Sequence, residues 1–178
     1  NLDINFFAPN APTIVPQYPS GRQWFNPYPN GTHYNEAGEA EKITMQNECL
    51  ESIRLLQEYI NKLCVLNHLK LKDCFIIGFS QGAMIAYELG KYMKSAISGC
   101  VMLSGRILSS DKLENNLFIK TPLMIAHGDQ DNVLEPKYFE EAGIILTNSG
   151  FLFDSFLIKN EGHTISTEMM KLAKNFIK

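Results

Sequence analysis

A serine in the pentapeptide Gly78-Phe79-Ser80-Gln81-Gly82 has the surroundings of a nucleophile. The apolar run 74–77 before it is typical of a strand, and residues 83–92 after it are typical of a helix. A sharp turn from strand to helix holds the serine at its tip in a strained conformation, and the two glycines let strand and helix approach closely. We therefore expect the Ser80 hydroxyl to lie exposed at a helix N-terminus, where the backbone N–H of Gln81 points at a developing oxyanion.

A serine hydroxyl needs a base to take its proton, and the base needs an acid that fixes its tautomer. His163 is the predicted base, because it follows a strand-like run, residues 151–158, and a glycine, on a loop that leads into the last helix. The remaining histidines lie in a polar loop, near the end of a long helix and at a strand end. We expect structural or surface roles for these three, His33, His68 and His127.

Two carboxylates compete for the role of the acid. Asp129 and Asp131 lie on one loop directly after the strand-like run 122–127, and by position alone either side chain reaches an imidazole. With either one, the chain order is serine, aspartate, histidine. That order is the one found in α/β-hydrolases, and it differs from the orders of chymotrypsin and subtilisin.

The chain resembles the acyl-protein thioesterase and bacterial carboxylesterase/phospholipase family of α/β-hydrolases. The motifs that carry the resemblance are residues 78–83 (GFSQGA), 127–134 (HGDQDNVL) and 162–165 (GHTI). Residues 8–12 and 21–25 also look like segments of that family, so the likeness extends over almost the whole chain. In the family, the pattern HGxxD places the acid at the position of Asp131, and the resemblance therefore favours Asp131 over Asp129.

One expected family feature has no match in this sequence. Family members usually begin with a strand and a His-Gly-x-Gly loop that carries a second oxyanion donor. Because the first residue is Asn1, we expect the chain to begin inside a longer polypeptide, whose upstream strand would lie beside residues 73–78. A non-catalytic hydrolase-like binding protein is the alternative if the natural polypeptide lacks that strand.

Strand-like and helix-like runs alternate, which predicts one α/β domain over residues 1–178, N-terminally incomplete, with a mostly parallel sheet and helices on both faces. The expected strands are residues 4–8, 73–78, 97–103, 122–127 and 151–158. The expected helices are residues 44–64, 81–94, 135–148 and 164–177, and the expected loops are residues 9–32 and the polar segment 106–120. All three candidate catalytic residues then fall at the carboxyl ends of strands, where open parallel sheets hold their sites.

The predicted loop 9–32 carries large apolar side chains, Trp24, Phe25 and Tyr28. Apolar groups on a long loop beside an active site can form the wall of an acyl pocket, so Trp24 and Phe25 are candidate substrate-binding residues. The alternative is that these rings only fix the loop to the body of the domain.

Composition excludes several classes of protein. The net charge of −3 and the lack of a nucleic-acid-binding module argue against nucleic acid as a partner. The sequence contains no run of 18 apolar residues, so we expect no transmembrane segment in it. Four cysteines in apolar settings without C-x-x-C pairing indicate buried thiols, and hence a reducing compartment such as the cytoplasm.

The sequence thus predicts a serine hydrolase that cleaves carboxylic esters or thioesters through an acyl-enzyme. The expected substrate is a small molecule or an acylated protein, and no metal or organic cofactor is required. A lysophospholipase is the alternative within the same chemistry, because it differs only in the pocket. The sequence leaves a homodimer open.

Overall fold

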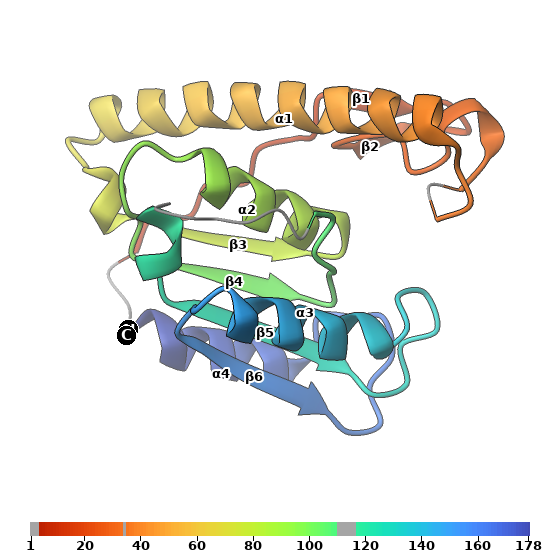
Figure 1. Cartoon of the computed structure of the whole chain (residues 1–178). Coiled ribbons are helices and arrows are strands. Elements are labelled where there is room, and N and C mark those ends of the chain that lie inside the picture. The colour runs from red at the N-terminus through yellow and green to blue at the C-terminus, as the bar shows by residue number, and fades with distance from the viewer. Residues whose placement is uncertain (1–3, 34, 110–116) are drawn as a thin grey trace. The chain divides into compact units, whose positions relative to one another are not determined.

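The computed structural model describes residues 4–33, 35–109 and 117–178, and the chain divides into two compact units, residues 1–58 (the N-terminal unit) and 59–178 (the C-terminal unit). The elements in chain order (Figure 1) are β1 (Thr13–Val15), β2 (Tyr18–Gln23), η1 (Pro29–Gly31), α1 (Glu39–Leu66), η2 (Leu71–Asp73), β3 (Phe75–Phe79), α2 (Gln81–Tyr92), β4 (Gly99–Leu103), η3 (Leu117–Lys120), β5 (Leu123–Gly128), α3 (Lys137–Asn148), β6 (Phe153–Ile158) and α4 (Thr167–Ile177). The division falls inside α1. A single domain over the whole chain stays a prediction.

The N-terminal unit contains a short antiparallel hairpin, β1 paired with β2, where the sequence predicts only loop. The prediction was wrong here because Pro19 and Gly21 look like strand breakers. The register shifts between Ile14 and Val15, which leaves Pro19 and Gly21 opposite an irregularity in the pairing. Proline and glycine are tolerated at such irregularities and on edge strands, since no ladder hydrogen bond is lost.

The strand predicted for residues 4–8 is absent, and this prediction was also wrong. Phe6 and Phe7 are exposed, and residues 4–11 form no regular element. A run of apolar residues forms a strand only when its backbone N–H and C=O groups pair with a neighbour. Among the described residues, no strand pairs with this segment.

Helix α1 is longer at both ends than the predicted helix 44–64. Glu39 and Glu41 lie in its first turn, where negative charge is favourable at the positive end of the helix dipole. After the last residue of α1 the chain turns at His68, whose φ of 55° lies in the left-handed region. The Leu69 N–H then donates a hydrogen bond to the Cys64 carbonyl at 2.9 Å, which caps the end of the helix. Although α1 has 28 residues, none of the described helices carries the apolar stretch needed to cross a membrane.

The C-terminal unit is built on a parallel sheet of four strands in the order β3-β4-β5-β6. These strands and the helices between them agree with the predicted runs to within a few residues. Every residue of β4 and β5 is buried, because these central strands are covered on both faces. Among the described residues, β4 is the only strand that pairs with β3.

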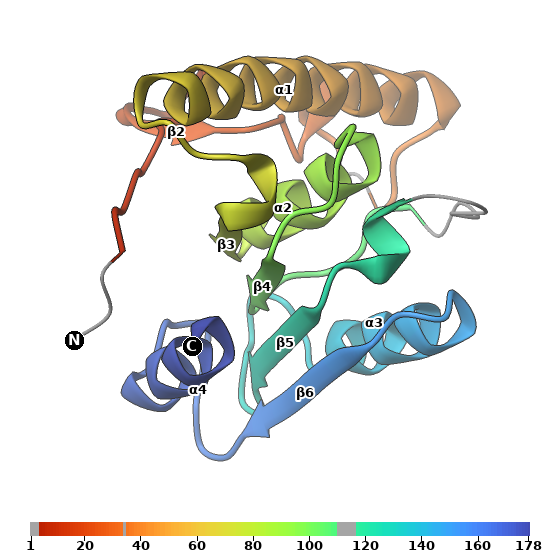
Figure 2. The ribbon, with the colours of Figure 1, turned by 90° about the vertical axis from the view of Figure 1, so that its left-hand side faces the viewer.

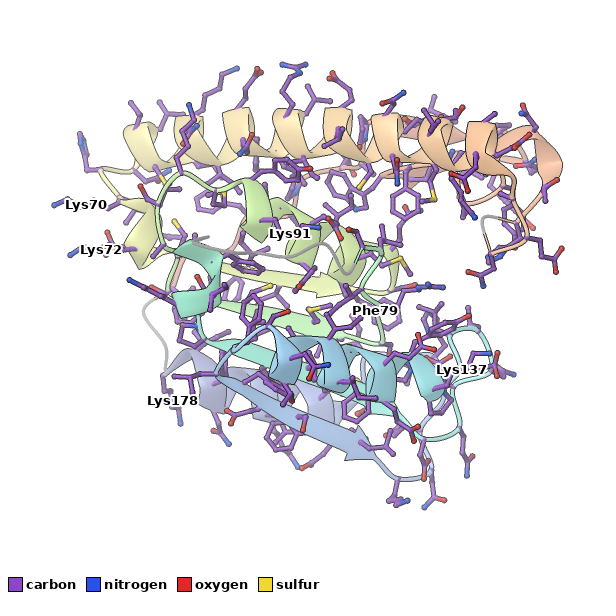
Figure 3. The ribbon with its side chains drawn as sticks, in the orientation of Figure 1. Lys70, Lys72, Phe79, Lys91, Lys137 and Lys178 are labelled. Atoms are coloured by element: carbon purple, nitrogen blue, oxygen red, sulfur yellow. The ribbon has the colours of Figure 1, made fainter. Side chains whose placement is uncertain are left out.

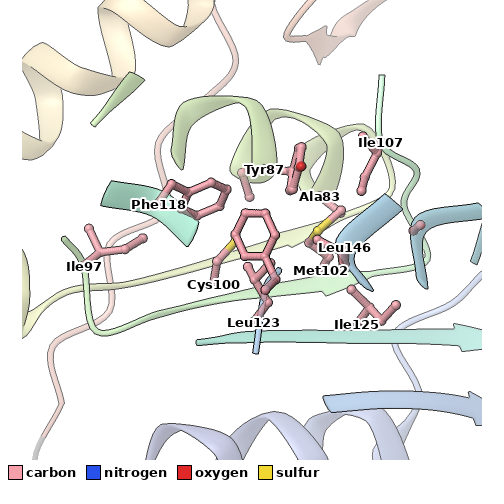
Figure 4. Packing of buried hydrophobic residues seen from close by; sticks show 13 residues of the cluster. Ala83, Tyr87, Ile97, Cys100, Met102, Ile107, Phe118, Leu123, Ile125 and Leu146 are labelled. Carbon is pink, nitrogen blue, oxygen red and sulfur yellow. The ribbon is translucent and has the colours of Figure 1, made fainter. Parts of the chain in front are cut away.

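Alternate residues of the central strands belong to two separate apolar layers, one on each face of the sheet. Cys100 and Met102 of β4 face α2 and α3, whereas Val101 and Leu103 face α4. Figure 2 shows α3 and α4 on opposite sides of the sheet, and Figure 4 shows the layer under α2. The predicted parallel sheet with helices on both faces is therefore confirmed within this unit.

The four cysteines are thiols in the structure. Cys49, Cys64 and Cys100 are buried and Cys74 is half-buried, with its Sγ 3.6 Å from that of Cys64. Burial raises the pKa of the Cys100 thiol to about 12, so this side chain packs as an apolar group. Of the polar segment predicted at residues 106–120, residues 110–116 lie outside the described part of the chain.

Two helical glycines offer a paired test of this packing. A Cβ on Gly90 of α2 would lie 2.2 Å from the Phe118 ring, which is itself 5.5 Å from the ring of Tyr87 and 5.3 Å from that of Phe151. We expect Gly90→Ala to destabilise the protein by about 1–3 kcal/mol, since overpacking outweighs the gain in helix propensity of roughly 1 kcal/mol. A Cβ on Gly143 of α3 would have no neighbour within 4 Å, so Gly143→Ala should stabilise by about 0.5–1 kcal/mol. Urea unfolding of both variants measures the difference, and equal shifts in both would contradict the packing of Gly90 against Phe118.

Candidate active site

Ser80 occupies the turn between β3 and α2, as the sequence predicts. β3 ends at Phe79 and α2 begins at Gln81, and Figure 3 shows Phe79 at the carboxyl end of its strand. The backbone of Ser80 has φ 53° and ψ −122°, a conformation that costs a non-glycine residue on the order of 1–3 kcal/mol. Such strain persists only where the surrounding structure imposes it.

The surroundings of Ser80 hold this turn by close backbone contacts. A Cβ on Gly78 would lie 2.1 Å from the carbonyl oxygen of Gly82, so only glycine allows β3 and α2 to approach this closely. The Ser80 N–H donates to the Leu103 carbonyl of β4 at 2.9 Å. A Cβ on Gly105, which follows β4, would lie 2.4 Å from the Cβ of Ala83 in α2, so these two segments also approach closely. The turn is therefore tied to both of the elements it joins and to the neighbouring strand.

The structure joins Ser80, His163 and Asp131 by hydrogen bonds. His163 Nε2 lies 2.9 Å from Ser80 Oγ, and His163 Nδ1 lies 2.7 Å from Asp131 Oδ2. The Asp131 side chain is fully buried, and that of His163 is 15% exposed. The ring of Phe79 packs 4.8 Å from the imidazole, centre to centre, and restricts its orientation.

The partners of His163 fix its tautomer. An ionised carboxylate only accepts hydrogen bonds, so the Nδ1 next to Asp131 carries the proton. In the neutral ring, Nε2 then has a lone pair directed at the hydroxyl of Ser80. This is the arrangement that a general base needs.

Asp131 stays ionised despite its burial. Burial alone would raise the pKa of this carboxyl group, but hydrogen bonds from His163, from the Leu134 N–H and from the Val133 N–H outweigh burial and lower the pKa below its ordinary value of 3.8. The two backbone donors meet Oδ1 at 2.8 and 2.9 Å. Asp131 thus presents a negative charge to His163.

Asp129, the other candidate for the acid, has different partners. Its Oδ1 accepts from the Asn160 N–H at 2.7 Å, and its Oδ2 lies 3.3 Å from Lys159 Nζ. Asp129 therefore binds the loop that carries His163, whereas Asp131 binds the imidazole itself. This distinction could not be made from the spacing of the two acids.

The structure places the other predicted residues in two different regions. Gln81 is the first residue of α2, where backbone N–H groups point out of the helix N-terminus. Trp24 and Phe25 belong to the N-terminal unit, in which Phe25 is buried and the Trp24 carbonyl accepts a hydrogen bond from Ser52 Oγ. The burial of Phe25 favours the packing alternative for that ring, and a substrate-binding role for Trp24 and Phe25 stays a prediction.

The N-terminal unit also holds a cavity of about 730 Å³. Tyr18, Gln23 and Tyr28 contribute to its lining, and Trp24 and Phe25 do not. An acyl-pocket role for the rings of this loop stays a prediction.

Sequence reasoning missed the surroundings of His127. Its side chain is buried, as expected for a structural histidine, yet its Nε2 lies 3.3 Å from Asp131 Oδ2. The only signal in the sequence was its position four residues before the acid, in the pattern HGxxD.

A parallel sheet covered on both faces, with the serine between strand and helix and the acid and histidine after later strands, is the arrangement of an α/β-hydrolase. The chain belongs to the phospholipase/carboxylesterase family, whose model matches residues 1–178. The expected family resemblance is therefore confirmed.

Relatives with assigned names are similar over nearly the whole chain. Acyl-protein thioesterase 1 of Candida albicans is 28% identical over 188 residues, which cover 100% of this chain and 78% of the relative. Esterase YpfH of Escherichia coli is 24% identical over 183 residues, which cover 98% of this chain and 73% of the relative. Both relatives are named as enzymes that cleave an ester or a thioester.

Solved structures give the same fold. The crystal structure of esterase PE8 superimposes with a TM-score of 0.80 at 26% identity, covering 95% of this chain and 75% of that one. The structure of Arabidopsis thaliana SOBER1 superimposes with a TM-score of 0.69 at 21% identity, covering 96% of this chain and 79% of that one, and supports the fold alone.

The ionisation of Asp131 has a measurable consequence for stability. Because its pKa is lower in the folded than in the unfolded protein, its contribution is complete above the ordinary value of 3.8 and is lost as the pH falls through the folded value. We expect the difference in unfolding free energy between the wild type and Asp131→Asn to be constant from about pH 6 down to about pH 4 and to shrink as the pH falls further. Denaturant titrations of both proteins across this range measure it. A difference that stays constant would mean that the folded protein does not favour the ionised carboxylate.

Proposed function

We propose that the chain is a serine hydrolase that cleaves carboxylic esters or thioesters through an acyl-enzyme, with Ser80, His163 and Asp131 as its catalytic triad. The observation that carries the proposal is the unbroken hydrogen-bond chain from the buried carboxylate of Asp131 through His163 to the strained Ser80. Membership of the phospholipase/carboxylesterase family supports it independently.

In the acylation half of the cycle, the Ser80 Oγ attacks the carbonyl carbon while His163 Nε2 takes the hydroxyl proton. The imidazolium formed is stabilised by Asp131, which remains a carboxylate because its hydrogen bonds from His163, Leu134 and Val133 favour the charged form. The protonated His163 then gives its proton to the leaving alcohol or thiol. In the second half, a water attacks the acyl-enzyme with the same base, and Ser80 is released.

The negative oxygen of the tetrahedral intermediate requires hydrogen-bond donors. Gln81, at the start of α2, follows the nucleophile directly, and its backbone N–H is the proposed first donor. By resemblance to the family, a loop of the His-Gly-x-Gly type would supply the second. Each step of this mechanism uses groups of the polypeptide, and none calls for a cofactor.

The substrate class follows from the family and from the named relatives. We propose a small-molecule ester or an acylated protein as the substrate, because the relatives include an acyl-protein thioesterase and an esterase. A lysophospholipase is the second candidate, since the family description includes phospholipases. Turnover of substrates with acyl chains of graded length distinguishes the two. A cytoplasmic location and a homodimer stay predictions.

Removal of the nucleophile tests the mechanism most directly. Ser80→Ala should lower kcat by about 10⁴ to 10⁶, because the members of a triad act as a unit and only binding and oxyanion contacts remain. A fluorophosphonate probe should label the wild type and leave the variant unlabelled, since it reacts with activated serines whatever the substrate. If Ser80→Ala keeps activity within tenfold of the wild type, the nucleophile is another residue. If the wild type is neither labelled nor active, the chain is instead the non-catalytic hydrolase-like binding protein.

The two acids of the HGxxD loop form a matched pair. Asp131→Asn should lower kcat by about 10³ or more, because His163 loses the acceptor that fixes its tautomer. Asp129→Asn should cost far less, since the amide oxygen can still accept from the Asn160 N–H. Steady-state kinetics with one ester substrate rank the two variants, and a greater loss in Asp129→Asn would transfer the role of the acid to Asp129.

A further inference from the structure

A second imidazole, besides that of His163, contacts the acid of the triad. His127 lies near the carboxyl end of β5, 1% exposed, with its ring 6.2 Å from that of Phe139. Its Nε2 is 2.7 Å from the Leu134 carbonyl oxygen and 3.3 Å from Asp131 Oδ2. The mechanism above assigns no part to this side chain.

The neighbours of His127 fix where its proton lies. A backbone carbonyl and an ionised carboxylate are both acceptors only, so the Nε2 that faces them must carry a hydrogen. Asp131 is ionised at neutral pH, because its pKa is lowered through the hydrogen bonds from His163, Leu134 and Val133, which outweigh its burial. The Nε2–H of His127 therefore donates to the Leu134 carbonyl, and it lies beside the negative charge of Asp131 Oδ2.

This contact adds to the hydrogen bonds around the carboxylate. Oδ1 of Asp131 accepts from the backbone N–H groups of Val133 and Leu134, and Oδ2 accepts from His163 Nδ1, with His127 Nε2 3.3 Å from the same Oδ2. Rotation of the carboxylate away from His163 would break bonds at both oxygens.

His127 also ties the acid's loop to the sheet. The Leu134 N–H donates to Asp131 Oδ1, while the Leu134 carbonyl accepts from His127 Nε2. The first bond joins the two ends of the loop from Asp131 to Leu134, and the second joins Leu134 to His127 of β5. The position of Asp131 Oδ2 relative to the strand depends on this link.

We propose that His127 is a positioning residue of the hydrolase, whose Nε2–H holds the Asp131 carboxylate in register with His163. This inference rests on the proposed function, because it assigns His127 a part in the same reaction. The competing explanation is that His127 only fills space beneath the loop, in which case any side chain of similar size should serve equally well.

A matched pair of substitutions separates the two explanations. Glutamine places its amide nitrogen near the position of a histidine Nε2, whereas methionine has a similar length and no donor. We expect His127→Met to lower kcat on the order of 10²-fold with KM within threefold, since a small misplacement of a catalytic group has effects of that size. We expect His127→Gln to recover kcat to within about fivefold of the wild type, because the donor is restored.

Both variants and the wild type should be compared on the full chain, with circular dichroism melting to establish that each is folded at the assay temperature. Equal losses in folded His127→Gln and His127→Met, or a folded His127→Met with wild-type kcat, would overturn the proposal. If His127→Met does not fold, His127→Gln decides alone: a folded glutamine variant that has lost more than about 30-fold in kcat excludes the donor role.

A double variant shows whether His127 acts through the acid. In an Asp131→Asn background, His127→Met should cause little further loss of kcat, because the group that it positions is already gone. Independent, multiplying losses would mean that His127 acts elsewhere. A wild type that neither hydrolyses esters nor reacts with a fluorophosphonate refutes the proposed function itself, and that result is seen before any His127 variant is made.

Discussion

The parallel pairing of β5 with β6 is the constraint on which the candidate site depends. It brings the loop after β5, which carries Asp131, beside the loop after β6, which carries His163. Beyond the last strand residues, the Asp129 N–H donates to the Ile158 carbonyl and the Gln130 N–H donates to the Glu161 carbonyl, each at 2.9 Å. Only glycine fits at position 128, since a Cβ there would lie 2.3 Å from the Glu161 oxygen. Backbone contacts thus fix the positions of the two loops that carry Asp131 and His163, independently of the hydrogen bond between these side chains.

The third member of the site comes from two strands away and is fixed in a different manner. Ser80 is held by a close approach of strand and helix, and by its N–H bond to Leu103 of the intervening strand. The candidate site therefore combines a well-bonded loop around Asp131 with a strained turn at Ser80. Both depend on the central strands, which are buried on both faces and are the least able to shift.

The parts of the molecule that the sequence predicts correctly are those with local signals. The predicted strands 97–103 and 122–127 contain the continuous apolar runs 99–103 and 122–126, as expected for strands covered on both faces, and the glycines around Ser80 mark its turn. The hairpin β1–β2 could not be predicted, because Pro19 and Gly21 oppose a strand locally and only the pairing register accommodates them. The contact between His127 and Asp131 was equally hidden, since it requires the loop to Leu134 to turn back on itself. A linear pattern gives the order of such groups but not their distances.

The positive φ of Ser80 has a consequence for how this protein responds to laboratory evolution. Glycine adopts that backbone conformation without the strain that serine carries, so Ser80→Gly is one of the few changes that would relax the turn while removing the proposed nucleophile. Libraries selected only for expression or heat tolerance would therefore enrich chains that lack the serine at this position. A screen that couples survival to ester turnover is needed to retain the serine, and the enrichment of glycine in an uncoupled screen would report the strain directly.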